Sequence, residues 1–211
     1  MKRLQVKICG MRDAANIADI ASLGADYMGF IFVPSSPRYV GKSFDAGNLA
    51  SLPSTTKRVG VFKDSPLELL VETIRNYSLD VVQLHGSEDD MYLKALKTAL
   101  PNTTIFKAIS VSAPENIASL TTSSVHPDAY LMDSGSGGTG TTFDWRWLRS
   151  YELAVPFILA GGIGLHNVDE IANITADYPQ LIGIDINSRA EREVAIKDKE
   201  ILREIFKRLG R

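Results

Sequence analysis

Short runs of branched and aromatic apolar residues alternate with longer amphipathic segments along the whole chain. The runs have the length and composition of strands, and the segments between them place apolar residues at helical spacing. The expected strands cover residues 4–9, 27–33, 57–62, 81–85, 105–111, 129–133, 157–161 and 181–187. The expected helices cover residues 13–24, 44–52, 66–77, 88–99, 114–121, 144–151, 166–175 and 198–209. This alternation predicts a parallel sheet covered by helices.

Eight strand–helix units without an extra strand favour closure into a (β/α)8 TIM barrel over an open doubly wound sheet. No linker or low-complexity stretch divides the sequence, so we expect one domain over residues 1–211. Helix-start signals agree with this: Asp13 and Ser65-Pro66 precede two of the helices, and Ser87-Glu88 is expected to open another.

Polar and apolar residues also alternate within the strands, and this alternation points to chemistry. In the first strand, Lys7 and Cys9 share the face opposite to the apolar one, and His85, Asp133 and Asp185 occupy the same parity at later strand ends. The apolar face packs on the helices, so the polar face lies inside the barrel. Because the carboxyl ends of barrel strands hold active sites, we interpret this protein as an enzyme.

Glycine-rich turns follow the sixth and seventh strands. In AGGIG at 160–164, Gly161 and Gly162 let backbone N–H groups approach an anion, and Asn187 and Ser188 follow the eighth strand. Loops after strands seven and eight form the usual phosphate site of this barrel. The alternative is a pair of tight turns that need glycine for geometry alone.

The sixth-strand loop, SGSGGTG at 134–140, includes Gly138 and is expected to contact or cover a substrate, although such loops also serve as plain connections. Arg38 follows the second strand, where its guanidinium suits a carboxylate or sugar hydroxyls, but an isolated arginine is more often solvated. For His85 the residues leave open a structural role or a site role.

Composition narrows the function without naming it. Apolar residues make up 45% and charged residues 23%, and the net charge is −2, so we expect no nucleic-acid partner. No segment reads as a signal peptide or membrane span, which predicts a cytoplasmic protein. Cys9 is the single cysteine, and with three scattered histidines it gives no metal-ligand spacing. We therefore predict no metal.

The order of several motifs resembles the phosphoribosylanthranilate isomerase family. They are KICGMRD (7–13), GADYMGFIF (24–32), SPRYV (36–40), VGVF (59–62), VVQLHGSE (81–88), LMDSGSGGTGTTFDW (131–145) and LAGGIGLHNV (159–168). The resemblance implies a cofactor-free Amadori rearrangement of N-(5-phosphoribosyl)anthranilate to 1-(2-carboxyphenylamino)-1-deoxyribulose 5-phosphate in tryptophan biosynthesis. It leaves the oligomeric state as monomer or homodimer.

The resemblance also implies roles for particular residues. Cys9 would be the general base and Asp133 the general acid. Independently of the resemblance, we expect neighbouring positive charge, from Lys7 or from the substrate iminium, to favour the Cys9 thiolate. The remaining candidates bind the substrate (Arg38, His85, Gly138) or its phosphate (Gly161, Gly162, Asn187, Ser188).

One loop departs from the family pattern. The chain reads DINSRAE at 185–191, whereas the usual family sequence at the end of the eighth strand resembles DVSSGVE. Asn187 therefore replaces a serine, and Arg189 replaces a glycine. If the backbone at position 189 has the left-handed conformation that glycine allows, arginine is disfavoured there. Two rivals follow: a histidine-pathway isomerase, which has an aspartate where this chain has Cys9, and a non-catalytic barrel that binds phosphosugars or a protein.

Overall fold

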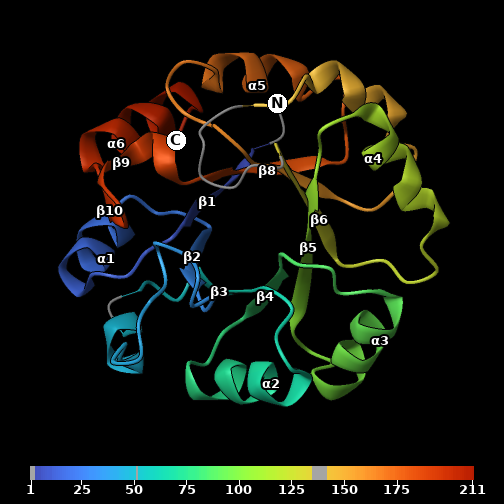
Figure 1. The fold of residues 1–211 in the computed structure, drawn as a ribbon. Coiled ribbons are helices and arrows are strands. Elements are labelled where there is room, and N and C mark those ends of the chain that lie inside the picture. The colour runs from blue at the N-terminus through green and yellow to red at the C-terminus, as the bar shows by residue number, and fades with distance from the viewer. Residues whose placement is uncertain (1–2, 51, 135–141) are drawn as a thin grey trace.

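The computed structural model describes residues 3–50, 52–134 and 142–211, which form a closed barrel of strands ringed by helices (Figure 1). The strands run parallel in sequence order, and β1 pairs with β8 to close the barrel. They are β1 (Gln5–Cys9), β2 (Tyr27–Ile31), β3 (Lys57–Phe62), β4 (Val81–Leu84), β5 (Thr104–Ser110), β6 (Ala129–Asp133), β7 (Phe157–Leu159) and β8 (Leu181–Ile186). The predicted (β/α)8 TIM barrel is confirmed.

The helical layer differs in detail from the prediction. The α-helices are α1 (Ala14–Ala21), α2 (Leu67–Asn76), α3 (Asp90–Ala99), α4 (Pro114–Ala118), α5 (Val168–Ile174) and α6 (Lys199–Arg208). The expected helices at 44–52 and 144–151 are the short 3-10 helices η1 (Ala46–Leu49) and η3 (Trp145–Ser150), and a third, η2 (Ser119–Thr122), continues α4. In η1, glycine and asparagine are weak helix formers, which favours a single tighter turn.

Asp13 and Ser65-Pro66 precede their helices as expected, whereas Ser87-Glu88 does not open a helix. Asp13 caps α1 as expected, since its carboxylate accepts from the Asn16 N–H. Helix α2 begins after Pro66, with no side-chain cap. Helix α3 begins at Asp90, because the Asp89 side chain accepts from the backbone three residues later and fixes the first turn there.

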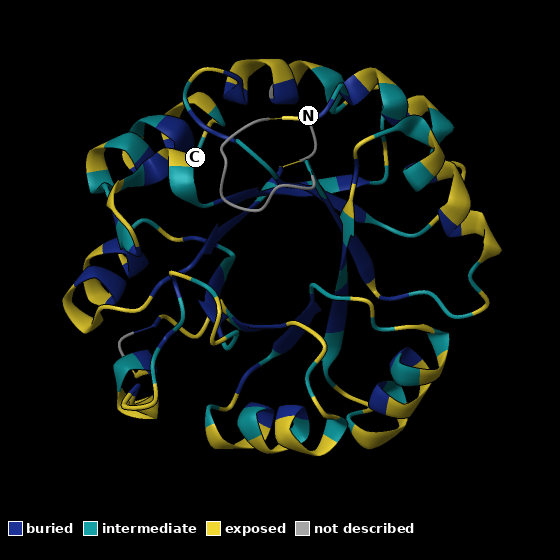
Figure 2. Cartoon of the chain, in the orientation of Figure 1, coloured by how far each residue is buried: buried dark blue, intermediate teal, exposed yellow. Residues whose placement is uncertain are grey.

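The strands are largely buried, while the helices expose their outer sides (Figure 2). The outward strand residues, including Val6, Ile8, Met132 and Ile184, pack in one cluster with the inner faces of the helices. The barrel interior is filled by a smaller cluster consisting of Val59, Val81, Phe106, Ala108, Ala129, Leu131, Ile158 and Ala160. The predicted inward face is confirmed at Lys7 and Asp185, which are buried and paired inside the barrel.

Three aspartates tie neighbouring strands together at the amino edge of the barrel. Asp26, Asp80 and Asp128 directly precede β2, β4 and β6. Their carboxylates accept from the backbone of the preceding strand at Val6 (2.8 Å), Arg58 (2.8 Å) and Ile105 (2.7 Å). Buried backbone donors are thereby satisfied at this edge.

Candidate active site

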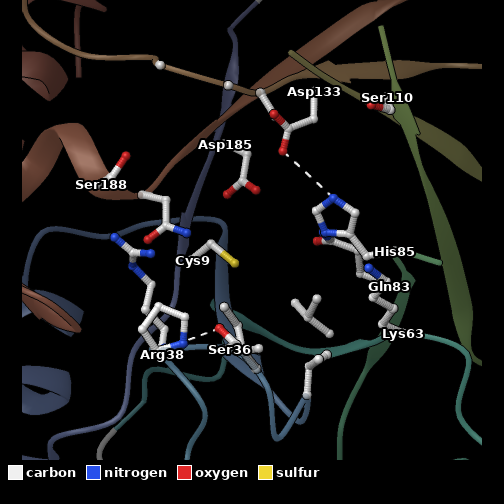
Figure 3. A pocket seen from close by; sticks show the side chains of 18 of the residues that line it. Cys9, Ser36, Arg38, Lys63, Gln83, His85, Ser110, Asp133, Asp185 and Ser188 are labelled. Carbon is white, nitrogen blue, oxygen red and sulfur yellow. Dashed lines mark hydrogen bonds and ion pairs between the residues drawn. The ribbon is translucent and has the colours of Figure 1, made fainter. Parts of the chain in front are cut away.

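A cavity of about 530 Å³ opens at the carboxyl edge of the barrel (Figure 3). Every strand contributes a lining residue at or next to its carboxyl end. These residues are Cys9, Ile31, Val61, Gln83, Ser110, Asp133, Ala160 and Asp185. A cavity at this edge, whose lining mixes charged and polar side chains with apolar ones, has the form of a site for a polar small molecule.

Cys9 lies on the cavity wall above a buried ion pair. Lys7 Nζ is 2.9 Å from Asp185 Oδ2, and the lysine side chain has no exposed surface. A Cβ at Gly29, on the neighbouring strand, would lie 2.9 Å from Cys9 Sγ and 3.1 Å from Lys7 Nζ. The absence of a side chain at Gly29 therefore gives the thiol and the ammonium group room to approach each other.

The charge state of Cys9 reflects opposing effects. Burial raises the pKa of the thiol above its ordinary value, and Asp185 acts in the same direction, while Lys7 opposes both. Burial also acts against the charged form of Lys7, but Asp185 and Cys9 outweigh it and raise the pKa of this lysine. Lys7 by itself lowers the pKa of the thiol and so favours the thiolate, as expected. The net shift is upward, because burial dominates.

We predict that alkylation of Cys9 by iodoacetamide titrates at higher pH than that of an ordinary cysteine. Replacing Lys7 with methionine removes the stabilising charge and should move this titration to still higher pH. Asp185→Asn removes a repelling charge and should move it to lower pH. Because Cys9 is the single cysteine, the rate of label incorporation measures it alone. A shift in the same direction for both variants would contradict this electrostatic arrangement.

Asp133 and His85 face each other on the other side of the cavity (Figure 3). Asp133 Oδ2 is 3.8 Å from His85 Nε2. Burial lowers the pKa of His85 below its ordinary value, with a further lowering by Lys7, although Asp133 and Asp185 oppose it. The imidazole is therefore mainly neutral at neutral pH, and it lies beside Asp133 without a short hydrogen bond to it.

The loops after β7 and β8 complete the rim. Gly161 and Gly162 both have positive φ, +77° and +64°, a conformation that side chains disfavour. A Cβ at Gly161 would lie 2.8 Å from Asp133 Oδ1, so glycine lets this loop approach the carboxylate. Asn187 and Ser188 also line the cavity. The four predicted phosphate-binding residues are thus brought together on one rim.

Arg38 also lines the cavity, but two of its donors are already paired. Its Nε and Nη2 donate to the two oxygens of Glu191 at 2.9 and 2.6 Å. Lys197 Nζ donates to Glu191 Oε1 at 2.6 Å and to Asn187 Oδ1 at 2.7 Å. Arg38 is therefore a fixed part of the rim, and its substrate contact stays a prediction.

This network anchors a hairpin that was not predicted. Strands β9 (Glu191–Glu193) and β10 (Ile196–Lys197) pair antiparallel after the short helix η4 (Ser188–Ala190). Arg189 lies in η4 and has no positive φ; the residue with left-handed backbone is Ala195, at +67°. The concern about arginine at this position is therefore resolved by a different local backbone.

Glu191→Gln is expected to destabilise the fold by about 3–5 kcal/mol, because it leaves the buried Lys197 ammonium without its counter-charge. Urea unfolding measures this. The exposed pair of Lys57 and Asp80, 3.7 Å apart, provides the control: Asp80→Asn should cost no more than about 1–2 kcal/mol, from the pair and its backbone bond together. Equal losses in the two variants would show that burial of the network is unimportant.

The pH dependence of this contribution follows from the pKa of Glu191. Burial raises it, but hydrogen bonds from Arg38 and the charge of Lys197 outweigh burial, so the folded-state pKa is lowered. A lowered carboxyl pKa contributes stability above the unfolded-state value, and this is lost as pH falls through the folded-state value. The difference between wild type and Glu191→Gln should therefore shrink in acid.

Two buried acceptor atoms in the cavity have no hydrogen-bond partner among the described residues. They are Gln83 Oε1 and Asp185 Oδ1. Such atoms carry a desolvation cost unless a ligand donates to them.

Within the described ranges, no cluster of three or more histidine, cysteine, aspartate or glutamate side chains could hold a metal ion. Gly138 lies outside the described residues.

Sequence reasoning missed several charged residues around the cavity. Glu191 and Lys197 follow the last barrel strand and are separated from Arg38 by more than 150 residues, so no local spacing connects them. Glu88 was assigned to a helix start and instead lies buried beside the cavity rim. Polar residues inside a buried strand are the available signal, and that signal located Lys7 and Asp185.

The closed barrel, with a thiol, an imidazole and carboxylates around one cavity at its carboxyl edge, defines a (β/α)8-barrel enzyme equipped for acid–base chemistry. The model of the N-(5'-phosphoribosyl)anthranilate (PRA) isomerase family matches residues 6–208. The chain belongs to this family.

Individual relatives agree along the whole length. An N-(5'-phosphoribosyl)anthranilate isomerase of Nostoc punctiforme is 35% identical over 98% of this chain and 99% of its own length. The crystal structure of phosphoribosyl anthranilate isomerase from Thermus thermophilus superimposes with a TM-score of 0.84 at 28% identity, covering 98% of both chains. A second crystal structure of a phosphoribosyl anthranilate isomerase, in complex with reduced 1-(o-carboxyphenylamino)-1-deoxyribulose 5-phosphate, superimposes with a TM-score of 0.77 at 24% identity, covering 98% of both chains.

None of the helices in the described parts of the chain is long and apolar enough to cross a membrane.

Proposed function

We propose that this chain isomerises N-(5'-phosphoribosyl)anthranilate to 1-(2-carboxyphenylamino)-1-deoxyribulose 5-phosphate in tryptophan biosynthesis, with Cys9 as general base and Asp133 as general acid. Family membership over residues 6–208 supports the reaction. The observation that supports the assignment of roles is that Cys9 and Asp133, from strands separated by β7 and β8, line the same cavity. A free thiol also fits a reducing, cytoplasmic location.

The reaction needs an acid first. Asp133, in its protonated form, donates a proton to the ring oxygen of the ribose as the bond from C1′ to that oxygen breaks, leaving an iminium on the anilino nitrogen. His85, mainly neutral and 3.8 Å from Asp133, lies where it can hydrogen-bond this carboxyl group or the released hydroxyl. The iminium then acidifies the proton on C2′.

The base acts second. The Cys9 thiolate removes the C2′ proton, which gives an enolamine that tautomerises to the ketose product. The adjacent Lys7 ammonium opposes the effect of burial on this thiol, and the positive iminium does the same while the substrate is bound. The atoms of substrate and product are the same, so no oxidant or cofactor is required.

Binding groups surround this centre. Gly161, Gly162, Asn187 and Ser188 form the rim that holds the phosphate, and Arg38 faces the substrate from the loop after β2. The unpartnered oxygen of Asp185 accepts a hydrogen bond from a substrate hydroxyl, which satisfies its buried position.

Complementation tests the proposed reaction in cells. The wild-type gene should restore growth without tryptophan to a strain lacking this isomerase, and Cys9→Ala should not. A strain lacking the corresponding histidine-pathway isomerase should stay auxotrophic, which separates the two Amadori reactions. Absence of tryptophan rescue by a well-expressed, folded wild-type protein would contradict the proposal.

A further inference from the structure

We propose that the Glu88–Lys107 ion pair is a positioning device that fixes the peptide after His85 and thereby holds the imidazole opposite Asp133. The inference rests on the proposed function of the cavity, since it concerns the surroundings of the acid. Neither residue lines the cavity, so both act through the loop that carries His85 and Gly86.

Glu88 folds back from the start of α3 onto the loop after β4. Its side chain is 2% exposed, and Oε2 accepts from the Gly86 N–H at 2.9 Å and from Lys107 Nζ at 2.6 Å. Lys107 Nζ in turn donates to the Gly86 carbonyl at 2.7 Å. The ion pair therefore holds both the donor and the acceptor of the residue that follows His85.

The same carboxylate joins two loops of the rim. Glu88 Oε1 accepts from the Asp64 N–H at 2.8 Å, and Asp64 Oδ1 accepts from the Ser87 N–H at 2.6 Å. A Cβ at Gly86 would lie 2.3 Å from Asp64 Oδ1, so the two loops pack in direct contact. The loop after β3 and the loop after β4 are therefore linked to each other and, through Lys107, to β5.

A purely structural role explains this arrangement poorly. A buried ion pair contributes little net stability, because the cost of removing two charges from water offsets their attraction. The comparable aspartates at the amino edge, Asp26 and Asp80, also pair with cations, but their side chains are 22% and 38% exposed. At the carboxyl edge the pair of Glu88 and Lys107 is far more buried, and Lys107 also donates to the carbonyl of Gly86, the residue next to His85.

The consequence concerns the distance between His85 and Asp133. With the backbone fixed on both sides, by the His85 N–H to the Phe62 carbonyl (2.8 Å) and by the held Gly86, only side-chain rotation remains. The charged groups that face the imidazole come from four strands and are Lys7, Lys107, Asp133 and Asp185. Of these four groups, Asp133 is the one that lies within ion-pair distance of the imidazole, with its Oδ2 3.8 Å from His85 Nε2.

A double-mutant cycle read by NMR tests the proposal without relying on activity. The three histidines can be titrated individually, with His126 and His166 as internal references. In the wild-type background, Asp133→Asn should lower the pKa of His85, because the carboxylate that raises it is removed. In the Glu88→Gln/Lys107→Met background this lowering should fall to less than about half, since the imidazole is no longer held near residue 133.

The double substitution leaves no unpaired buried charge, which protects folding, and Glu88→Gln alone is the second variant. We expect kcat/KM to fall about 10- to 100-fold in both, the range for displaced catalytic groups. Asp128→Asn is the matched control: it neutralises a carboxylate that accepts from a backbone N–H, as Glu88 does, and should leave both readouts unchanged. A full Asp133 effect on His85 in the double variant, or a kcat/KM within about twofold of wild type, would overturn the proposal. A wild-type protein that turns over no substrate contradicts the proposed function instead, and the NMR cycle still decides the positioning role.

Discussion

Replacing Cys9 with alanine is expected to lower kcat by about 10²–10⁴-fold, the usual contribution of a general base. The thiolate is the group that we assign to accept the C2′ proton, and alanine offers no acceptor in its place. Cys9→Ser should be comparably slow, because a hydroxyl is far harder to ionise than a thiol. Loss of the substrate's anthranilate fluorescence gives the rate directly.

The matched control for Cys9 is Ser110→Ala. Ser110 also lies at a strand end and lines the cavity, but we assign it no role, so its variant should keep most of the wild-type rate. Substrate binding by Cys9→Ala should stay within about tenfold of wild type, because the lost interaction belongs to the transition state. A Cys9→Ala variant with near-normal kcat would remove the thiol from the mechanism.

Asp133→Asn is expected to have the second large effect, again about 10²–10⁴-fold in kcat. The amide keeps the size and hydrogen-bonding shape of the carboxyl group but cannot transfer a proton to the ring oxygen. Ring opening then depends on water or on the neutral His85, which is a poorer acid. The same fluorescence assay measures the loss.

Asp128→Asn controls for the removal of a carboxylate near this strand. Asp128 directly precedes β6 and Asp133 ends it, so the two lie at opposite edges of the barrel. The Asp128 variant should lose stability by about 1 kcal/mol, the net value of a hydrogen bond, and keep its activity. If Asp133→Asn retained wild-type turnover, the acid would have to be another group.

The fold was predictable because it follows from local patterns. Each strand has a recognisable alternation of apolar and polar residues, and each is followed by a segment with helical periodicity. Eight such units in sequence predict the closed barrel. The same parity predicted that Cys9, His85 and Asp133 face inward, and their position at strand ends predicted that they share one edge of the barrel. Helix ends were less predictable, since a single cap such as Asp89 moved the start of α3 past Glu88.

The supporting charges could not be predicted, because their partners are distant in sequence. Arg38 meets Glu191 across 153 positions, and Lys107 meets Glu88 from the next strand. No periodicity encodes such pairs, and a short hairpin such as β9–β10 has too few residues for a strand signal. The structure therefore changed the interpretation of Arg38, whose donors are partly occupied, more than that of the acid–base pair.

The most direct test of the proposed mechanism is a side-by-side assay of purified wild type, Cys9→Ala and Asp133→Asn with N-(5'-phosphoribosyl)anthranilate and no added cofactor. We predict steady loss of anthranilate fluorescence with wild type, formation of the ketose product, and rates lower by about 10²–10⁴-fold in each variant. Turnover by either variant at the wild-type rate, or none by the folded wild-type protein, would contradict it.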